Sequence, residues 1–244
     1  MTSISRVALV TGAAGGIGSA TVRALVEQGY AVVGFDLRRA PESEQVAHVV
    51  GDVRDREALQ HAVSVALDRW GRLDATVAAA AVIAGGHPLW EAPDGELPEL
   101  LDVDVRGVWN TAAVAVPAML DGPDPRGCRF VALASAAASY GLFHLAAYTA
   151  AKHAVVGLVK GLAVDLVGTG VTAVAVSPGS TRTDMLAATA DLYHLPDPED
   201  FAASQLLRRL LEPEEIAATI AFCCSVQGGV LNGTVVHADG GFRP

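Results

Sequence analysis

The chain is poor in cysteine, in aromatic residues and in positive charge. Its three cysteines, Cys128, Cys223 and Cys224, have neither disulfide nor zinc-ligand spacing, so a reducing cytoplasm is expected. With 27 acidic against 17 basic residues the net charge is -10, which argues against nucleic acid and anionic membranes as partners. The chain has no run of about 18 apolar residues, no signal-peptide pattern and no metal-ligand spacing, so neither a membrane span nor a metal is predicted.

What the 244 residues do contain is a repeated alternation of short apolar runs with helical patterns. Hydrophobic residues make up 51% of the chain, which suits buried parallel strands covered by helices. The alternation predicts an α/β fold in one domain over residues 1–244, a doubly wound parallel sheet with helices on both faces. Strands are expected at residues 7–10, 31–36, 48–53, 73–80, 129–135, 171–177 and 234–238, and helices at 19–28, 55–70, 146–167 and 212–225.

Two segments have a less regular pattern. Residues 97–120 are expected to hold two helical segments, broken near 102–106. Residues 180–205 contain Pro196 and Pro198 and are interpreted as irregular. Loops of that size are typical of functional lids. We therefore expect the segment to cover a substrate pocket.

A glycine-rich loop joins the first strand to the first helix. Its sequence is Thr11-Gly12-Ala13-Ala14-Gly15-Gly16-Ile17-Gly18. Glycines at these positions let the backbone turn tightly and approach a pyrophosphate, which then rests on the helix N-terminus. The loop alone is a weak signal, but its position directly after a strand predicts a dinucleotide site, formed by Gly12, Gly15, Gly16, Ile17 and Gly18.

The residue that ends the second strand bears on the choice of dinucleotide. Asp36 follows Gly18 by eighteen residues, and a carboxylate there accepts hydrogen bonds from the adenosine ribose and repels a 2′-phosphate. Leu37, and not an arginine, comes next, so NAD is favoured over NADP. Arg38 and Arg39 fit either an exposed basic loop or a phosphate contact.

A second acidic residue follows the third strand. Asp52 is placed to bond the adenine amino group, with Val53 packed on the ring. The alternative is that Asp52 forms a turn or caps the following helix.

Three polar residues predict proton transfer. Tyr148 and Lys152 stand four apart, which puts them on one face of a helix, and Ser135 precedes the tyrosine by thirteen residues. A free phenol has a pKa near ~10, and an adjacent ammonium favours the phenolate. With a serine hydroxyl to bond a carbonyl or alcohol oxygen, the set fits the interconversion of alcohol and ketone.

Taken in order, these motifs resemble a known family. The chain is similar to a classical short-chain dehydrogenase/reductase over essentially its whole length. The resemblance rests on residues 11–18, Gly51-Asp52-Val53, Ser135, Tyr148-x-x-x-Lys152, Pro178-Gly179 and Asp239-Gly240-Gly241. It implies a Rossmann fold with seven strands in the order 3-2-1-4-5-6-7 and a homotetramer or homodimer.

The resemblance also implies roles for single residues. Tyr148 would be the general acid/base, Lys152 would lower its pKa and hold the nicotinamide ribose, and Ser135 would orient the substrate oxygen. The nicotinamide side would be contacted by Pro178, Gly179, Thr181 and Thr183.

Two positions depart from the family pattern. Residues 78–81 are all alanine where many members have Asn-Asn-Ala-Gly, although Ala79 and Ala80 still permit close approach of the cofactor. The family's catalytic asparagine falls on Asp104. Asp104 keeps the main-chain carbonyl that serves the proton relay and adds a charge near Lys152.

A narrower resemblance is to a mycofactocin-associated actinobacterial branch. It rests on residues 82–90, 178–183 and 205–210, and implies a tightly held NAD that passes electrons to a peptide-derived redox carrier. The expected substrate residues are His144, Met185, Leu186 and Tyr193. For His144 the alternative is a loop residue without chemistry, and for Tyr193 a residue on the lid surface.

Two hypotheses follow from the sequence. The first is an NAD-dependent oxidoreductase that interconverts a small, largely apolar secondary alcohol and its ketone. The second is a dinucleotide-binding sensor or scaffold with impaired catalysis, motivated by Asp104 and the alanine run.

Overall fold

The computed structural model describes residues 6–244. Within them, seven parallel strands form one sheet in the order β3-β2-β1-β4-β5-β6-β7, which confirms the expected doubly wound topology. The strands are β1 (Arg6–Thr11), β2 (Tyr30–Asp36), β3 (Val46–Val50), β4 (Ala75–Ala78), β5 (Arg129–Leu133), β6 (Thr172–Pro178) and β7 (Val235–Ala238).

The central strands are apolar on both faces because both faces are covered. In β1, Val7 and Leu9 belong to one buried core, and the alternate residues Ala8 and Val10 belong to a second core on the opposite face. Continuous apolar runs of this kind are what a parallel sheet between two helical layers requires.

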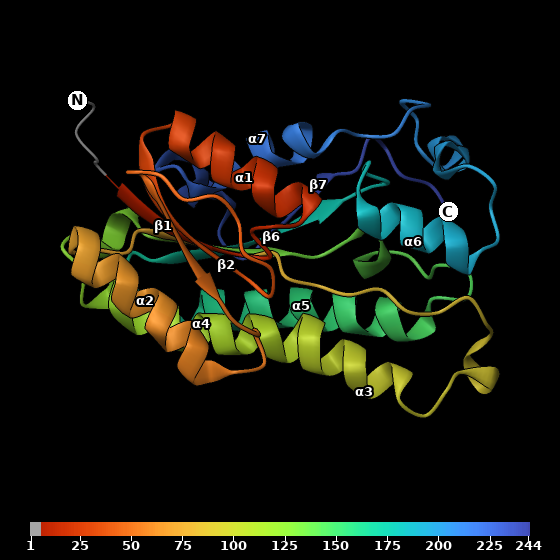
Figure 1. The fold of residues 1–244 in the computed structure, drawn as a ribbon, viewed down its shortest axis with the longest axis horizontal. Coiled ribbons are helices and arrows are strands. Elements are labelled where there is room, and N and C mark those ends of the chain that lie inside the picture. The colour runs from red at the N-terminus through yellow and green to blue at the C-terminus, as the bar shows by residue number, and fades with distance from the viewer. Residues whose placement is uncertain (1–5) are drawn as a thin grey trace.

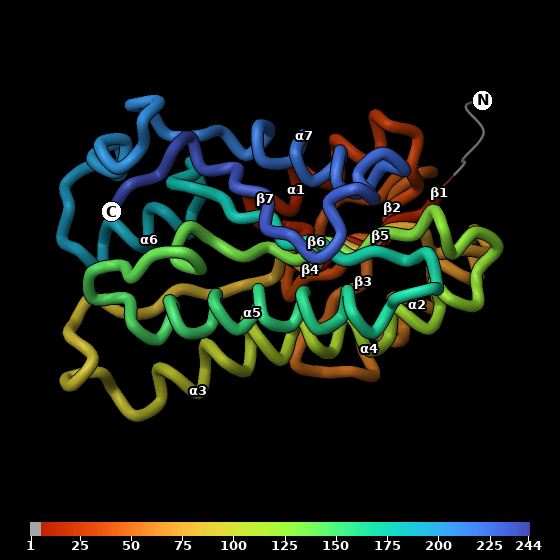
Figure 2. The backbone as a smooth tube through the Cα atoms, turned by 180° about the vertical axis from the view of Figure 1, so that it is seen from behind, coloured from red at the N-terminus to blue at the C-terminus, as the bar shows by residue number. Residues whose placement is uncertain are grey.

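Two layers of helices sandwich the sheet. On one face lie α1 (Gly16–Glu27) and α7 (Pro213–Cys224), which pack against each other. On the other lie α2 (Arg56–Trp70), α4 (Arg106–Leu120) and α5 (Ala146–Asp165) (Figure 1). The view from behind shows the same layers, with α4 and α5 side by side (Figure 2). Short helical turns connect the layers: η1 (Leu89–Glu91), η3 (Pro125–Gly127), η4 (Ala136–Ala138) and η6 (Gln227–Leu231).

The irregular stretch expected at residues 180–205 is largely helical, so that interpretation was wrong. It contains α6 (Asp184–Leu192) and the 3₁₀ segment η5 (Pro198–Ser204). Thr183 begins α6 by accepting a hydrogen bond from the Leu186 backbone N–H, which is ordinary N-capping. The prolines lie between and at the start of the two helices, where they interrupt neither.

The break expected near residues 102–106 is present as an interruption of the α-helix, but it does not end the helix. The helix continues from α3 (Glu96–Leu100) through a π-helical turn, η2 (Leu101–Val105), directly into α4. A π turn accommodates one extra residue without ending the helix, and such turns are frequent at functional sites. The third strand also differs from the expected 48–53, because it ends at Val50 before the turn formed by Gly51 and Asp52.

No helix within residues 6–244 combines the length and the apolar character needed to cross a lipid bilayer.

A buried carboxylate joins the amino ends of two central strands. Asp74, just before β4, accepts a hydrogen bond of 2.7 Å from the Val7 N–H of β1 and pairs with Arg72 at 2.6 Å. The Asp74 side chain is 1% exposed, so loss of its charge would leave the Arg72 guanidinium and the Val7 N–H without their acceptor.

We predict that Asp74→Ala lowers the free energy of unfolding by about 2–4 kcal/mol, because it strands a buried donor and breaks a largely buried ion pair. Urea denaturation followed by circular dichroism measures the change. Asp68→Ala, which alters an exposed carboxylate on α2, is the matched control and should change stability by less than about 0.5 kcal/mol. Equal stability of the two variants would contradict this role of Asp74.

Candidate active site

A large cavity lies at the carboxyl edge of the sheet. It has a volume of about 900 Å³ and is lined by the segments that follow β1 to β6, together with the lid, residues 180–205. In open parallel sheets the carboxyl ends of the strands meet at one edge, and ligands bind in the crevice outside them. We call this space the carboxyl-edge cavity.

The glycine loop packs closely against the segment after β4. Gly12 has φ of +68°, and a Cβ there would lie 2.8 Å from the Ala80 nitrogen. A Cβ on Gly18 would lie 2.0 Å from the Gly12 oxygen. The Thr11 hydroxyl accepts hydrogen bonds from the Ala79 and Ala80 N–H groups, at 3.1 and 3.2 Å. Thr11 therefore braces the alanine run that replaces the family's asparagines.

The N-terminus of α1 opens into the cavity without a side-chain cap. Gly15 is the N-cap and has no side chain to bond the free N–H groups, and no acidic residue lies in the first turn. Gly15, Gly16, Ile17 and Gly18 all line the cavity. Free N–H groups and the positive end of the helix dipole suit a phosphate, so these residues fit a dinucleotide pyrophosphate.

Asp36, at the end of β2, lies beside the glycine loop and lines the cavity. Its carboxylate accepts hydrogen bonds from the Ala14 and Arg38 backbone N–H groups, at 3.0 and 2.9 Å. The Arg38 guanidinium donates to the Ala14 carbonyl and lies 3.9 Å from Asp36. Leu37 is exposed and lines the cavity. The loop thus holds a carboxylate at the cavity wall, with one arginine folded beside it.

Asp52 and Val53 line the same end of the cavity. The Arg54 guanidinium bonds the Asp52 carboxylate at 2.6 Å and holds its pKa below the usual range. Asn110, which the sequence analysis did not single out, donates from its amide to the Val53 and Arg54 carbonyls at 3.1 and 3.2 Å. This buried amide on α4 holds the turn that carries Asp52. A polar residue on the apolar face of a helix is the signal that would have identified it.

Ser135, Tyr148 and Lys152 all reach the same cavity. Tyr148 and Lys152 lie on the same face of α5, with the Lys152 Nζ 5.4 Å from the centroid of the tyrosine ring. Ser135 follows β5 and caps η4 by accepting from the Ala137 N–H at 3.2 Å. All three line the cavity, although Tyr148 and Lys152 are only 7% and 2% exposed.

Asp104 lies behind Lys152 and outside the cavity wall. Its carboxylate oxygen Oδ2 is 3.0 Å from the Lys152 Nζ, and Oδ1 accepts a hydrogen bond of 2.8 Å from the Val82 N–H. Burial disfavours the Lys152 ammonium, but Asp104 and the Tyr148 oxygen outweigh it, so the pKa of Lys152 is raised. For Tyr148, burial and the Asp104 charge outweigh the opposing effects of Lys152 and Ser135, so its pKa is raised as well.

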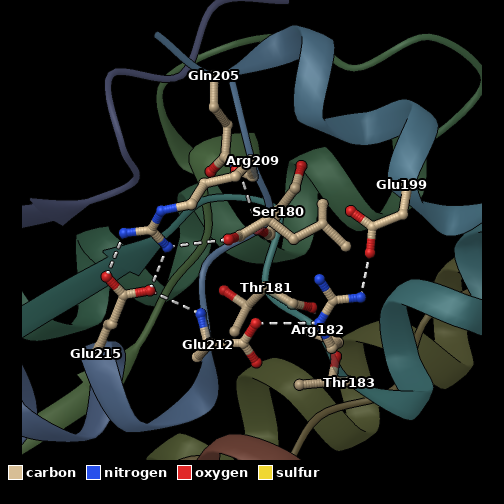
Figure 3. A network of polar contacts seen from close by, with 10 residues as sticks. Ser180, Thr181, Arg182, Thr183, Glu199, Gln205, Arg209, Glu212 and Glu215 are labelled. Carbon is tan, nitrogen blue, oxygen red and sulfur yellow. Dashed lines mark hydrogen bonds and ion pairs between the residues drawn. The ribbon is translucent and has the colours of Figure 1, made fainter. Parts of the chain in front are cut away.

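Ion pairs and hydrogen bonds stabilise the lid and the segment that connects it to α7. Arg182 pairs with Glu199 of η5 and, at 3.1 Å, with Glu212 at the start of α7 (Figure 3). Arg209 bonds both oxygens of Glu215. The buried Gln205 amide donates to the Ser180 and Arg209 carbonyls. Arg182 stands between Thr181 and Thr183, so its pair with Glu199 joins the two ends of the lid and its pair with Glu212 joins the lid to α7. Of the expected nicotinamide-side residues, the cavity is lined by Pro178, Gly179, Thr181 and Thr183.

The lid end of the cavity is apolar. Met185, Leu186 and Tyr193 line it, whereas His144 is stacked on Phe143 and does not. His144 has φ of 55°, a turn conformation, and its carbonyl accepts from the Gly86 N–H. Burial raises the pKa of Tyr193 to about 12, so its phenol stays neutral at ordinary pH. Lining residues that were not assigned to the substrate from the sequence are Val82, Ile83, Leu142, Phe143, Leu145, Thr189, Leu195 and Phe242.

Between Arg6 and Pro244, no group of three or more His, Cys, Asp or Glu side chains is placed to hold a metal ion.

Residues 12–243 match the family model described as Enoyl-(Acyl carrier protein) reductase. The chain is a short-chain dehydrogenase/reductase. This confirms the family expected from its motifs. The family binds a nicotinamide dinucleotide, and its relatives include alcohol and ketone oxidoreductases.

Named relatives cover almost the whole length of this short-chain dehydrogenase/reductase. It is 33% identical over 249 residues to the A-factor type gamma-butyrolactone 1'-reductase (1S-forming) of Streptomyces virginiae, covering 97% of this chain and 95% of the relative. It is 31% identical over 270 residues to (-)-trans-carveol dehydrogenase of Rhodococcus erythropolis, covering 97% and 96%.

Solved structures agree in fold. The dehydrogenase superposes on levodione reductase with a TM-score of 0.89 at 28% identity, over 96% of both chains. The 3-ketoacyl-(acyl-carrier-protein) reductase of Brucella melitensis, complexed with NADH, gives a TM-score of 0.86 at 27% identity, over 97% of this chain and 98% of that one.

Proposed function

We propose that this oxidoreductase uses NAD to interconvert a secondary alcohol and its ketone. The observation that carries the proposal is the convergence of Ser135, Tyr148 and Lys152 in one cavity with the uncapped glycine loop. A bound nicotinamide dinucleotide supplies the hydride chemistry. The apolar side chains at the lid end favour a largely apolar substrate.

The chain's own residues move the proton. The Ser135 hydroxyl donates a hydrogen bond to the substrate oxygen and so fixes its position. In alcohol oxidation the Tyr148 phenolate accepts the hydroxyl proton, and in ketone reduction the phenol returns it. Lys152 holds positive charge beside the phenol and stabilises the phenolate. The lid keeps water from the apolar end of the cavity.

Asp36 supports the choice of NAD over NADP. Its carboxylate is fixed at the cavity wall by two backbone N–H groups, where an added phosphate would meet like charge. Arg38 is turned to the Ala14 carbonyl and lies beside Asp36, so much of its charge is balanced locally.

We predict that the protein binds NAD at least about a hundredfold more tightly than NADP, or ~2.7 kcal/mol, because the Asp36 charge repels the 2′-phosphate. Calorimetric titration with each dinucleotide measures the ratio. Asp36→Asn keeps the acceptor oxygen and loses the charge, and should reduce the ratio about tenfold or more. Arg38→Ala is the control that keeps the NAD preference. Equal affinities of the unaltered protein for the two dinucleotides would exclude NAD specificity.

We predict that Tyr148→Phe lowers turnover by about 10²–10⁴-fold, because the phenylalanine ring cannot accept or donate the substrate proton. Steady-state assays with a panel of secondary alcohols and ketones measure turnover, and calorimetry should find NAD affinity little changed. Full activity of Tyr148→Phe would overturn the assignment. If the unaltered protein binds NAD but transfers no hydride across the panel, the alternative of a dinucleotide-binding sensor or scaffold is favoured.

The proposal includes a tightly held NAD that a mycofactocin-type carrier recycles in place. It is supported by the two ion pairs of Arg182, which hold the lid closed on itself and join it to α7.

We also propose a homotetramer or homodimer in the cytoplasm. Its support is the set of exposed apolar side chains on α4, α5 and η6, namely Trp109, Val164 and Val230, and three free, buried cysteines.

We predict that NAD co-purifies with the protein and exchanges little with excess isotope-labelled NAD over hours. Mass spectrometry of the bound nucleotide measures the exchanged fraction. Arg182→Ala should accelerate exchange about tenfold or more, because it breaks the ion pairs that Arg182 makes with Glu199 inside the lid and with Glu212 at the start of α7. Arg23→Ala, which breaks the exposed pair with Glu214 between α1 and α7, is the control. Rapid exchange in the unaltered protein would point to an ordinary dehydrogenase.

A further inference from the structure

Lys152 has a buried counter-ion. Its Nζ lies 3.0 Å from the Asp104 carboxylate, and the two side chains are 3% and 0% exposed. At this distance and depth, neither water nor salt screens the two charges from each other. The ammonium that faces Tyr148 is therefore one half of an ion pair.

The Asp104 carboxylate is held in place from two sides. Its second oxygen accepts the Val82 backbone N–H at 2.8 Å, so the segment after β4 fixes its orientation. Asp104 also lies within the π-helical turn Leu101–Val105, where Asp102 is exposed while Asp104 is fully buried. A rotated or solvent-facing position for Asp104 would break both contacts.

The other charges on the elements that pack against Tyr148 and Lys152 are farther from the pair or already matched. Glu96 of α3 pairs with His87 at 2.7 Å, and Asp102 of η2 pairs with Arg106 at 3.4 Å. Arg129 lies at the amino end of β5, opposite the cavity, and bonds the Ser225 and Val226 carbonyls. β6 carries no titratable side chain. On α5 the other groups are His153, which bonds the Thr149 carbonyl, and the exposed Lys160 and Asp165, which lie at least two helical turns beyond Lys152. The remaining groups, Tyr193, Glu99 and Asp184, line the cavity.

We infer that Asp104 is a positioning residue that holds Lys152 and cancels part of its charge at Tyr148, so that Tyr148 releases its proton at a higher pH than it would beside an unpaired lysine. The inference rests on the proposed function for its meaning in catalysis. A neutral residue at position 104 leaves a full positive charge beside the phenol. A carboxylate at 3.0 Å turns that charge into a dipole, whose field falls off more steeply with distance.

The effects of the neighbouring charges on the pKa of Tyr148 are consistent with the ion pair between Lys152 and Asp104. Apart from burial, the Asp104 charge is what raises the pKa of Tyr148, whereas Lys152 lowers it. The same carboxylate, together with the Tyr148 oxygen, raises the pKa of Lys152. Asp104 therefore weakens the action of the Lys152 charge on the phenol.

The test is the titration of Tyr148 in the free protein, followed by NMR of tyrosines carrying a ¹³C label at the ring carbon that bears the hydroxyl. The chain has four tyrosines, and the Tyr148 signal is assigned as the one missing from Tyr148→Phe. Asp104→Asn removes the charge and keeps an oxygen for the Val82 N–H. We expect the Tyr148 midpoint to fall by about one pH unit in this variant, within the range that a nearby charge produces. If the unaltered protein unfolds in alkali before Tyr148 titrates, a midpoint for Asp104→Asn below that limit is the same result.

Asp102→Asn is the matched control, because it removes a carboxylate from the same turn that is exposed and paired only with Arg106. The Tyr148 midpoint should not move in this variant. Circular dichroism checks the fold of each protein, and Asp104→Ser replaces Asp104→Asn if the latter does not fold. An unchanged or higher midpoint in the Asp104 variant, or an equal fall in Asp102→Asn, would overturn the inference.

The titration needs neither cofactor nor turnover, so it is decided separately from the proposed function. If the enzyme is active, the acid limb of kcat/KM for alcohol oxidation should move to lower pH in Asp104→Asn by the same amount as the NMR midpoint. An acid limb that stays in place while the NMR midpoint falls would show that Tyr148 does not limit the reaction. That result would contradict the proposed function and leave the pairing intact.

Discussion

Parallel pairing of the seven strands is the constraint on which the site depends. Because the strands point the same way, the segments that follow them emerge at one edge, and the chain is obliged to place its loops there. The glycine loop, Asp36, the alanine run and Ser135 lie far apart in sequence, yet each comes at or just after the end of a strand. A single cavity then collects a nucleotide-binding end, a proton-transfer centre and an apolar lid end.

Burial on both faces of the sheet supplies the rigidity that such a site needs. The two apolar cores on opposite sides of β1 fix the strands, and the carboxylates and amides that remain inside are bonded to backbone groups. Asp74 joins β1 to the start of β4, Thr11 joins β1 to the segment after β4, and Asn110 joins α4 to the turn after β3. Each contact satisfies a buried polar group, and those of Thr11 and Asn110 also fix segments that line the cavity.

The features that were predicted correctly from sequence are those with a local cause. The spacing of Tyr148 and Lys152 is a property of one helix, and the glycine loop is recognisable from the strand before it. The pairing of Asp104 with Lys152 could be anticipated as a nearby charge, but its geometry depends on a π turn that no simple periodicity indicates. Because of the prolines at 196 and 198 the whole segment was interpreted as irregular, and α6 was missed, although Thr183 is an ordinary helix cap. His144 was expected to contact the substrate. Its backbone has a turn conformation and its ring stacks on Phe143, and neither feature can be read from the sequence.

The central claim is that the cavity joins a dinucleotide to a proton-transferring tyrosine. The most direct measurement is a single turnover of the NAD-loaded protein with a secondary alcohol, followed by the near-ultraviolet absorbance of reduced nicotinamide. The account predicts that the absorbance appears, and that deuterium at the carbinol carbon slows its appearance. Bound NAD that stays oxidised with every secondary alcohol, and reduced nicotinamide that stays reduced with every ketone, would contradict it.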